Sequence, residues 1–360
     1  SEIAIRIARA ASDLGIRAVA IYSEDDQDNL HLRVADEAAA LAGAGPNAYL
    51  DINNIISIAK ARGCDAIHPG YGFLSERVDF AERCREEGLI FIGPREEHLS
   101  LFGDKTAARN TAETIGIPIL RGINHAVSVE EAKEFFETIS PNHVIIKALA
   151  GGGGRGTRVV TAIDEMEALY DRCKSEANAA FGRDEVYVEE FIPRAQHIEV
   201  QIVGDNDGKV IQLGERECSY QRRYQKLIEI APAPFLNNKL RTKITQAALK
   251  FAEHVRYNNL GTFEFLVDVS DDHHEERFAF IETNARLQVE HTVTEAVTGV
   301  DLVQTQIQLS EGASLASLGL DGSSMHPRGY AIQTRVNMEK FASDGSLLPA
   351  SGSLSAYEAP

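Results

Sequence analysis

The chain has 360 residues, 44% of them hydrophobic and 25% charged, with a formal net charge of −18 at pH 7, which predicts two or three globular subdomains with ample hydrophobic core. The negative charge argues against nucleic acid and anionic membrane surfaces as partners, and the lack of an apolar run of about 18 residues predicts no membrane span. Four scattered cysteines without a CxxC motif, and an N-terminus without a signal-peptide pattern, are typical of a cytoplasmic protein or, in a eukaryote, of one in the mitochondrial matrix.

Helix and strand patterns alternate along the first quarter of the chain. Apolar spacing predicts helices at 2–14, 52–62 and 80–87. Short apolar runs predict strands at 17–22, 65–68 and 89–92. Because strands and helices alternate, we expect an α/β subdomain with a doubly wound parallel sheet. The chain opens directly in a helix, so we expect a strand that would normally precede it to be missing.

The rest of the chain is divided differently. Residues 95–120 are predicted to be mostly helical, and residues 143–190 to form a small lobe around a glycine-rich turn. Longer strands are predicted after this lobe, at 197–203, 210–214, 262–267, 278–282 and 330–336.

The glycine-rich turn is a candidate phosphate contact. Strands predicted at 144–148 and 157–161 place the glycines of 151–156 at the tip of a hairpin. They lack the Gly-Lys-Ser/Thr ending of a Walker A loop and the following helix of a dinucleotide fingerprint. Glycine lets backbone N–H groups approach phosphate closely, and Lys147 at the strand end could reach a phosphate as a point charge. The alternative is a flexible hairpin tip without a ligand.

Cations gather at residues 215–226, although the chain as a whole is acidic. The segment reads Glu-Arg-Glu-Cys-Ser-Tyr-Gln-Arg-Arg-Tyr-Gln-Lys, and Ala-Pro-Ala-Pro follows at 231–234. Any phosphate site in so acidic a chain must be locally basic, so this segment is a candidate. A solvated loop is the alternative.

A third segment predicts a cation site. Apolar runs on either side of a polar tip at 271–275 predict a hairpin in which Glu264 lies opposite Glu282, and Asn284 shares their face. Neighbouring carboxylates repel each other unless a cation lies between them, and Glu and Asn oxygens suit Mg²⁺ or Mn²⁺ held jointly with phosphates. The alternative is a solvated strand face with unrelated charges. This register would point three apolar side chains into the core, Phe263, Phe265 and Ile281.

Together these segments resemble the biotin carboxylase component of biotin-dependent carboxylases. The resemblance covers essentially the whole chain, and its motifs are His-Pro-Gly-Tyr-Gly-Phe-Leu-Ser-Glu at 68–76, Gly-Asp-Lys-Thr-Ala-Ala-Arg at 103–109, Lys147 with the glycine hairpin, Gln-Arg-Arg-Tyr-Gln-Lys at 221–226 and Asn-Ala-Arg-Leu-Gln-Val-Glu-His at 284–291. That family has an ATP-grasp fold, in which two lobes close over the nucleotide.

The resemblance implies an organisation and an activity. The expected parts are an N-terminal subdomain, a helical connector, a glycine-rich lid lobe and a C-terminal antiparallel-sheet lobe, at 1–94, 95–120, 121–191 and 192–360. The implied reaction carboxylates biotin on a biotin carboxyl carrier domain with bicarbonate and ATP, by way of carboxyphosphate. ATP, Mg²⁺ or Mn²⁺ and biotin would be bound. A carrier domain and a carboxyltransferase domain or subunit would be partners, in a homodimer or larger oligomer.

The resemblance also assigns residues to the nucleotide. Lys105 and Lys147 would contact the ATP phosphates or the adenine side. Gly153 and Gly154 would lie in the lid over the phosphates. The remaining nucleotide contacts would be the adenine hinge from Glu189 to Ile192, His197 near the ribose, Gln221 and Tyr224. The metal ions would be held by Glu264, Glu282 and Asn284.

Bicarbonate and biotin complete the implied site. Bicarbonate would be held by Lys226, Arg286, Gln288 and the Val289 backbone. Glu290 would be the general base that deprotonates it. Arg335 would stabilise the biotin enolate, and Tyr71 would contact biotin.

Simpler roles stay open for four of these residues. Arg335 could pair with a surface carboxylate, and Glu290 could cap the helix that begins near His291. Tyr71 could belong to the core, and His197 could be a structural histidine.

The chain departs from the family pattern at several positions. Tyr224 stands where the family usually has His, and Ala285 replaces a commoner Thr or Pro. Thr292 follows His291 as in pyruvate carboxylases. The chain stops at Pro360, before the family's last segment, so we expect a fragment or part of a longer polypeptide.

Two other classes of function also stay open. Another ATP-grasp ligase, such as a carbamoyl-phosphate synthetase domain, shares the grasp and metal residues but does not need Tyr71 or Arg335. A non-catalytic ATP-binding domain kept for assembly is the second, and the intact Lys226, Arg286 and Glu290 argue against it. The final carboxyl acceptor, whether acyl-CoA, pyruvate or urea, would be chosen by a domain outside this sequence.

Overall fold

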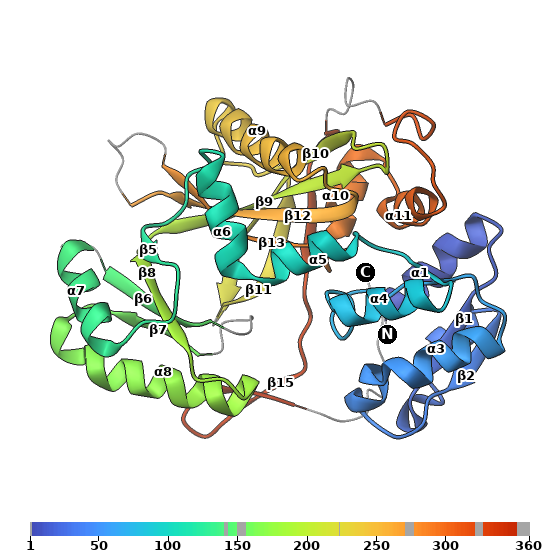
Figure 1. Cartoon of the computed structure of the whole chain (residues 1–360), viewed down its shortest axis with the longest axis horizontal. Coiled ribbons are helices and arrows are strands. Elements are labelled where there is room, and N and C mark those ends of the chain that lie inside the picture. The colour runs from blue at the N-terminus through green and yellow to red at the C-terminus, as the bar shows by residue number, and fades with distance from the viewer. Residues whose placement is uncertain are drawn as a thin grey trace.

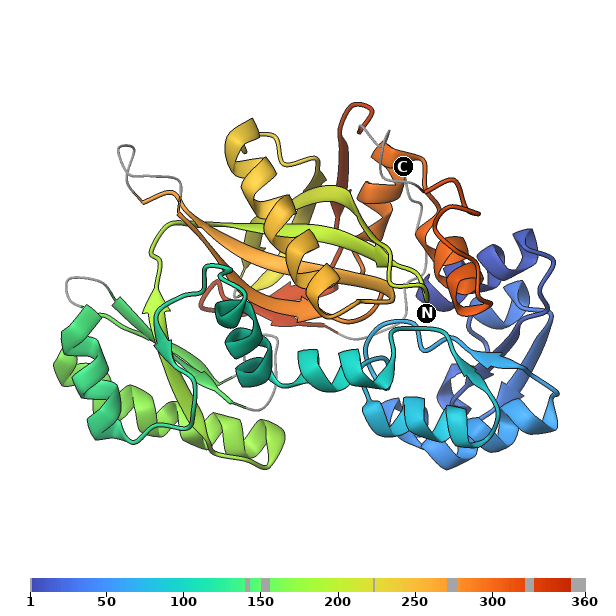
Figure 2. The ribbon, with the colours of Figure 1, turned by 45° about the horizontal axis from the view of Figure 1, so that its top comes forward.

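The computed structural model describes residues 2–139, 143–149, 156–222, 224–270, 277–320 and 327–350. Figure 1 shows three lobes: an N-terminal lobe in blue, a small lobe in green, and a large lobe in yellow to red built on a long sheet. Two teal helices connect the first two lobes and run along the large sheet, as the turned view of Figure 2 also shows. Within the described ranges, none of the helices has both the length and the apolar character that crossing a lipid bilayer requires.

The N-terminal lobe alternates helix and strand. Its helices are α1 Glu2–Asp13, η1 Glu24–Asp26, α2 His31–Val34, η2 Pro46–Leu50, α3 Ile52–Ala61 and α4 Val78–Glu86. Its strands are β1 Val19–Tyr22, β2 Glu37–Ala40, β3 Ala66–Ile67 and β4 Ile90–Phe91. β1 pairs with β2 and β3 pairs with β4, both in parallel, in two separate short sheets. The prediction of parallel strands alternating with helices is confirmed.

The connector consists of α5 Glu96–Gly103 and α6 Lys105–Thr114, as the helical pattern of 95–120 predicts. Asp104 separates the two helices. Its carboxylate accepts hydrogen bonds from the backbone N–H groups of Thr106 at 2.9 Å and Ala107 at 3.0 Å, which is a favourable N-cap. Because Asp104 is the N-cap, α6 begins at Lys105, and the helix holds the backbone of this lysine in a fixed place.

The small lobe is a four-stranded antiparallel sheet with helices packed against it. Its elements are β5 Gly122–Ile123, α7 Val129–Ile139, β6 His143–Ala148, β7 Thr157–Val160, η3 Ile163–Glu165, α8 Met166–Phe181 and β8 Val186–Phe191. The strand order is β5-β8-β6-β7. β6 and β7 pair with Lys147 opposite Thr157, which confirms the two strands predicted around the glycines. The glycine tip itself, with Gly153 and Gly154, lies outside the described residues.

The large lobe is built on a six-stranded sheet in the order β13-β12-β9-β10-β11-β14. Its elements are β9 Ala195–Gly204, β10 Val210–Arg222, β11 Gln225–Ala231, α9 Asn238–His254, β12 Asn259–Asp268, β13 Phe278–Asn284, α10 His291–Thr298, α11 Leu302–Ser310 and β14 Ala331–Thr334, with a separate hairpin of β15 Glu339–Phe341 and β16 Leu347–Pro349. The alternative of a solvated loop at 215–226 is wrong, because most of that segment belongs to the paired strands β10 and β11.

Alternation along the strands separates a core face from a polar face. On β9 the buried Ile198, Val200 and Ile202 pack in one core with helices α5, α6 and α9. The intervening residues, His197 and Glu199, therefore lie on the opposite face. Glu264, the register partner of Glu199, and Lys226, which forms an ion pair with Glu199, share this polar face.

The predicted pairing of Glu264 with Glu282 is confirmed. A bulge directly after this pair brings Phe265 opposite Phe280, with ring centroids 5.8 Å apart. Phe263 and Phe265 are buried in the core as expected. Ile281 is only partly buried and packs against a small separate cluster, so its placement in the main core is wrong. The extra residue of the bulge shifts the alternation, and Phe280 takes that place.

Candidate active site

Lys226 lies at the centre of the polar face, near the start of β11. Its Nζ lies 2.7 Å from Glu290 Oε1 and 3.5 Å from Glu264 Oε1, and it also pairs with Glu199. Burial alone would lower the pKa of Lys226, but the carboxylates of Glu264 and Glu290 outweigh burial and raise that pKa above its usual value. Lys226 therefore keeps its positive charge and forms ion pairs with three carboxylates.

Glu290 is buried and precedes α10 directly. It occupies the N-cap position, yet its side chain makes no capping hydrogen bond. One carboxylate oxygen contacts Lys226 and the other accepts a hydrogen bond from Arg335 at 3.0 Å. Burial alone would raise the pKa of Glu290, but Lys226, Arg216 and Arg335 hold it below its usual value. The group is a carboxylate at neutral pH and can accept a proton.

Arg335 follows β14 and is placed by a backbone hydrogen bond from its N–H to Leu227 O at 2.9 Å. Its Nε lies 2.5 Å from Glu229 and its Nη2 lies 3.0 Å from Glu290. Both carboxylates are almost fully buried, so the alternative of a pair with a surface carboxylate is wrong. The guanidinium borders the site and keeps part of its surface open to a ligand.

Tyr71 comes from the N-terminal lobe and reaches the same region. Its ring packs partly buried against a core cluster shared with α11, while its hydroxyl donates a hydrogen bond to Glu2. Burial and the neighbouring Glu2 raise the pKa of Tyr71. The ring of Tyr71 therefore packs against the core as the simpler alternative predicts, and its contact with biotin stays a prediction.

The segment between β13 and α10 carries Arg286 and Gln288. Arg286 donates to Asn284 Oδ1 at 2.9 Å and forms an ion pair of 3.1 Å with Glu76 of the N-terminal lobe. Gln288 donates from Nε2 to Glu264 Oε1 at 2.8 Å. Val289 is partly buried between them and Glu290. The structure therefore brings Lys226 and Gln288 together at Glu264, and the contacts of Lys226, Arg286, Gln288 and Val289 with bicarbonate stay a prediction.

The predicted metal ligands also lie on adjacent strands. Glu264 and Glu282 are register partners, and Asn284 Nδ2 donates to Glu264 Oε1 at 2.5 Å. Lys105 Nζ lies 3.7 Å from Glu282 Oε2. Carboxylate and amide oxygens are the ligands that Mg²⁺ and Mn²⁺ prefer, so this group remains the candidate cation site.

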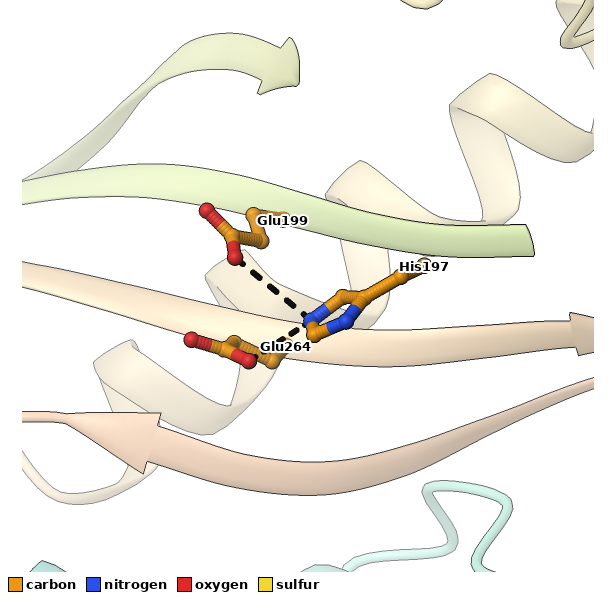
Figure 3. A group of neighbouring side chains, drawn as sticks. All are labelled: His197, Glu199 and Glu264. Carbon is orange, nitrogen blue, oxygen red and sulfur yellow. Dashed lines mark hydrogen bonds and ion pairs between the residues drawn. The ribbon is translucent and has the colours of Figure 1, made fainter. Parts of the chain in front are cut away.

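His197 lies against Glu264 rather than apart from it (Figure 3). His197 Nε2 lies 2.6 Å from Glu264 Oε2 and 3.5 Å from Glu199 Oε1. Gln221 Nε2 lies 2.9 Å from His197 Nδ1, and an amide nitrogen only donates, so Nδ1 accepts and Nε2 carries the proton. His197 therefore donates to an expected metal ligand, and its contact with the ribose stays a prediction.

The predicted nucleotide contacts of the small lobe form a buried charge cluster. Lys147 Nζ lies 2.5 Å from Glu189 Oε2, and the other Glu189 oxygen pairs with Arg109 of α6. Burial alone would lower the pKa of Lys147, but Glu189 raises it above its usual value. Ile192, directly after β8, is buried in an apolar cluster with Leu120 and Ala279. Tyr224 lies at the tip of the β10–β11 hairpin with φ of 63° and is 53% exposed.

Three buried charged residues of the site were not predicted. Glu199 pairs with Lys226, Glu229 pairs with Arg335, and Arg216 lies fully buried beneath them. A signal exists in the sequence for Glu199 and Glu229, because each is a charged residue between apolar residues of a strand, and a charge in such a place needs a partner. The sequence alone does not say which partner.

Two family models match most of the chain. The model for the biotin carboxylase N-terminal domain matches residues 1–99, and the model for the carbamoyl-phosphate synthase L chain ATP-binding domain matches residues 104–318. The pyruvate carboxylase of Bacillus subtilis (strain 168) is 51% identical over an alignment 362 residues long, which covers 99% of this chain and 31% of that protein. The biotin carboxylase of Nostoc sp. is 47% identical over an alignment 361 residues long, which covers 100% of this chain and 78% of that protein.

Solved structures give the same result. A biotin carboxylase–β,γ-ATP complex from Campylobacter jejuni is 42% identical with a TM-score of 0.90, over 97% of this chain and 76% of that chain. The biotin carboxylase domain dimer of Hydrogenobacter thermophilus 2-oxoglutarate carboxylase, with MgADP, ADP and bicarbonate, is 41% identical with a TM-score of 0.88, over 94% of this chain and 73% of that chain. The present chain spans only 28–31% of the pyruvate carboxylases that it matches.

Proposed function

This chain belongs to the biotin carboxylase family, and we propose that it catalyses the ATP-dependent carboxylation of biotin on a carrier domain, with bicarbonate as the carbon source. One observation carries the proposal. The buried carboxylate of Glu290 lies between the ammonium of Lys226 and the guanidinium of Arg335. A base flanked by two cations suits a substrate that becomes more negative when it loses its proton.

The first half of the proposed reaction activates bicarbonate. Lys226, Arg286, Gln288 and the Val289 backbone hold the anion, and Glu290 takes its proton. The freed oxygen attacks the γ-phosphorus of ATP, the bond to the β-phosphate oxygen breaks, and ADP leaves carboxyphosphate behind. Charge builds on phosphoryl oxygens during this step, so positioned cations lower its barrier.

The second half carboxylates biotin. Carboxyphosphate splits into CO₂ and phosphate, with the bridging oxygen staying on phosphorus. The phosphate takes the proton from N1 of biotin, and Arg335 stabilises the enolate oxygen as a cation that does not lose its proton at working pH. N1 then attacks CO₂. Tyr71, which approaches from the N-terminal lobe, contacts biotin.

The nucleotide lies between the small lobe and the polar face. Lys105 and Lys147 supply positive charge for the phosphates, and Glu189 holds Lys147 until the nucleotide arrives. Glu264, Glu282 and Asn284 would hold Mg²⁺ or Mn²⁺, which neutralises charge on the phosphates when bound. The same proposal includes Gly153 and Gly154 as a lid over the phosphates and residues 189–192 as the adenine hinge. It also includes nucleotide contacts from His197, Gln221 and Tyr224.

The proposed partners follow from the chemistry of the product. Carboxybiotin must pass to an acceptor, so a biotin carboxyl carrier and a carboxyltransferase, on this polypeptide or on separate subunits, are required. The domain dimer of the Hydrogenobacter relative supports a homodimer. We also propose a cytoplasmic or mitochondrial-matrix location. The chain is proposed to divide into four parts, with boundaries after residues 94, 120 and 191.

The alternatives are separated by one assay on the full-length protein. Release of ADP that requires bicarbonate and is stimulated by free biotin supports the proposal. Release that responds to ammonia and not to biotin indicates a carbamoyl-phosphate synthetase-like ligase, which the family model over residues 104–318 makes the relevant competitor. ATP binding with no turnover under any of these conditions indicates a non-catalytic assembly domain.

A further inference from the structure

Arg216 is a buried cation that none of the proposed steps uses. Its side chain is 0% exposed and lies on β10, beneath the polar face. The guanidinium donates hydrogen bonds to side chains from three secondary-structure elements and from the segment that precedes α10: Gln201 at 2.9 Å, Thr294 at 3.0 Å, Thr262 at 3.0 Å, Gln288 at 2.8 Å and Glu199 at 3.4 Å. Because the buried guanidinium donates hydrogen bonds to all of these side chains, it holds them in place.

One of these bonds decides which way Gln288 faces. A guanidinium has only donors, so the atom of Gln288 that meets Arg216 must be the amide oxygen. The amide nitrogen is then turned toward the site, where it lies 2.8 Å from Glu264 Oε1. A donor aimed into the site can serve a bound anion, whereas a flipped amide would present an oxygen and repel it.

A second bond governs Lys226. Glu199 divides its two oxygens between Arg216 and Lys226. The charge of Arg216 partly neutralises this fully buried carboxylate. Without Arg216, Glu199 would hold Lys226 more strongly and draw its ammonium away from Glu290, which lies 2.7 Å from it.

We propose that Arg216 is a positioning residue for bicarbonate, acting through the amide of Gln288 and through the division of Glu199 between two cations. The inference rests on the proposed function, because bicarbonate is the anion that Gln288 and Lys226 receive. Arg216 itself touches no substrate. Its loss should therefore weaken the use of bicarbonate and leave the use of ATP nearly unchanged.

The test compares Arg216→Lys and Arg216→Met with wild type in the full-length protein, by ADP release at varied bicarbonate and at varied ATP. We expect the KM for bicarbonate to rise by about tenfold or more, as for a lost hydrogen bond to a charged ligand, and the KM for ATP to change by less than about twofold. Arg241→Met is the matched control. Arg241 pairs with Glu215 on the opposite face of β10, so its loss should reduce stability without a selective effect on bicarbonate.

A double-mutant cycle separates positioning from general damage. In a Gln288→Leu background there is no amide left to orient, so Arg216→Lys should raise the bicarbonate KM less than it does in wild type, and only by the part that acts through Glu199. If the Arg216 variants do not fold, Thr262→Val and Thr294→Val each remove one acceptor of the guanidinium, and each should raise the bicarbonate KM by about threefold, a smaller loss of the same kind.

The possible failures are distinct. Equal effects of Arg216→Lys in both backgrounds, matching changes in the two KM values, or unchanged bicarbonate KM in both threonine variants would overturn the inference and leave the proposed function standing. A wild-type protein that shows no bicarbonate-dependent ADP release would overturn the proposed function, and the positioning role with it.

Discussion

Glu290 and Arg335 share a hydrogen bond of 3.0 Å, which joins the expected base for bicarbonate to the expected clamp for biotin. The two residues come from different elements, the start of α10 and the end of β14. In the proposed reaction, the groups of the two half-steps are therefore in direct contact. A biotin enolate that binds Arg335 would then compete with Glu290 for its guanidinium.

Glu290→Gln should nearly abolish bicarbonate-dependent ATP cleavage and biotin carboxylation together. The amide keeps the size of the side chain but cannot take a proton, and removal of a positioned base typically lowers the rate by about 10²–10⁴-fold. ADP release with and without biotin measures both. Full activity of this variant in either assay would assign the proton transfer to another group.

Arg335→Ala should separate the two half-steps. The guanidinium acts on biotin, and loss of one preorganised stabilising group lowers a rate by about 10²–10³-fold. Biotin carboxylation should fall by that amount, and bicarbonate-dependent ATP cleavage without biotin should fall far less. Arg335→Lys keeps the charge and serves as the control. Equal losses in the two assays would give Arg335 a structural role instead.

Glu282→Gln should weaken Mg²⁺-dependent turnover by more than about tenfold while the fold is retained. The carboxylate faces Glu264 across β12 and β13, and an amide is a poorer ligand for a hard cation. Activity measured against Mg²⁺ concentration should shift to higher metal. Glu253→Gln, on the exposed face of α9, is the matched control. An unchanged Mg²⁺ dependence contradicts the ligand assignment.

Acid should destabilise the protein partly through Glu290. Its pKa is lowered in the folded protein from an ordinary value of 4.5, because cations outweigh burial. Such a group stabilises the fold above the unfolded pKa, and this stabilisation is lost as pH falls through the lower folded pKa. Below about pH 4.5, the wild-type free energy of unfolding should fall more steeply than that of Glu290→Gln. Chemical denaturation at several pH values measures this slope, and parallel slopes would contradict it.

The sequence predicted which strand residues of the candidate site face each other, but not the buried charged residues beneath them. The pairing of Glu264 with Glu282 followed from alternation alone, since the register of a hairpin is set by its apolar faces. The bulge that moves Ile281 out of the core leaves no mark in that alternation. Glu199, Arg216 and Glu229 were missed for a related reason. Each is a charge inside a strand, and only the approach of several strands and α10 supplies its partner.

The small lobe shows a second limit. Lys147 was predicted to meet phosphate from its place beside the glycines, and its strand is where the sequence puts it. The ion pair with Glu189, and that of Glu189 with Arg109, join residues far apart in the chain. Local pattern contains no information on such contacts.

The most direct test follows an oxygen atom. Full-length protein is incubated with ATP, biotin and bicarbonate labelled with heavy oxygen, and the inorganic phosphate is analysed by mass spectrometry. If bicarbonate attacks the γ-phosphate, one labelled oxygen per turnover must appear in phosphate, and Glu290→Gln must lose both the label transfer and the turnover. Phosphate formed without label, at an undiminished rate, would show that water is the attacking group and would contradict the central claim.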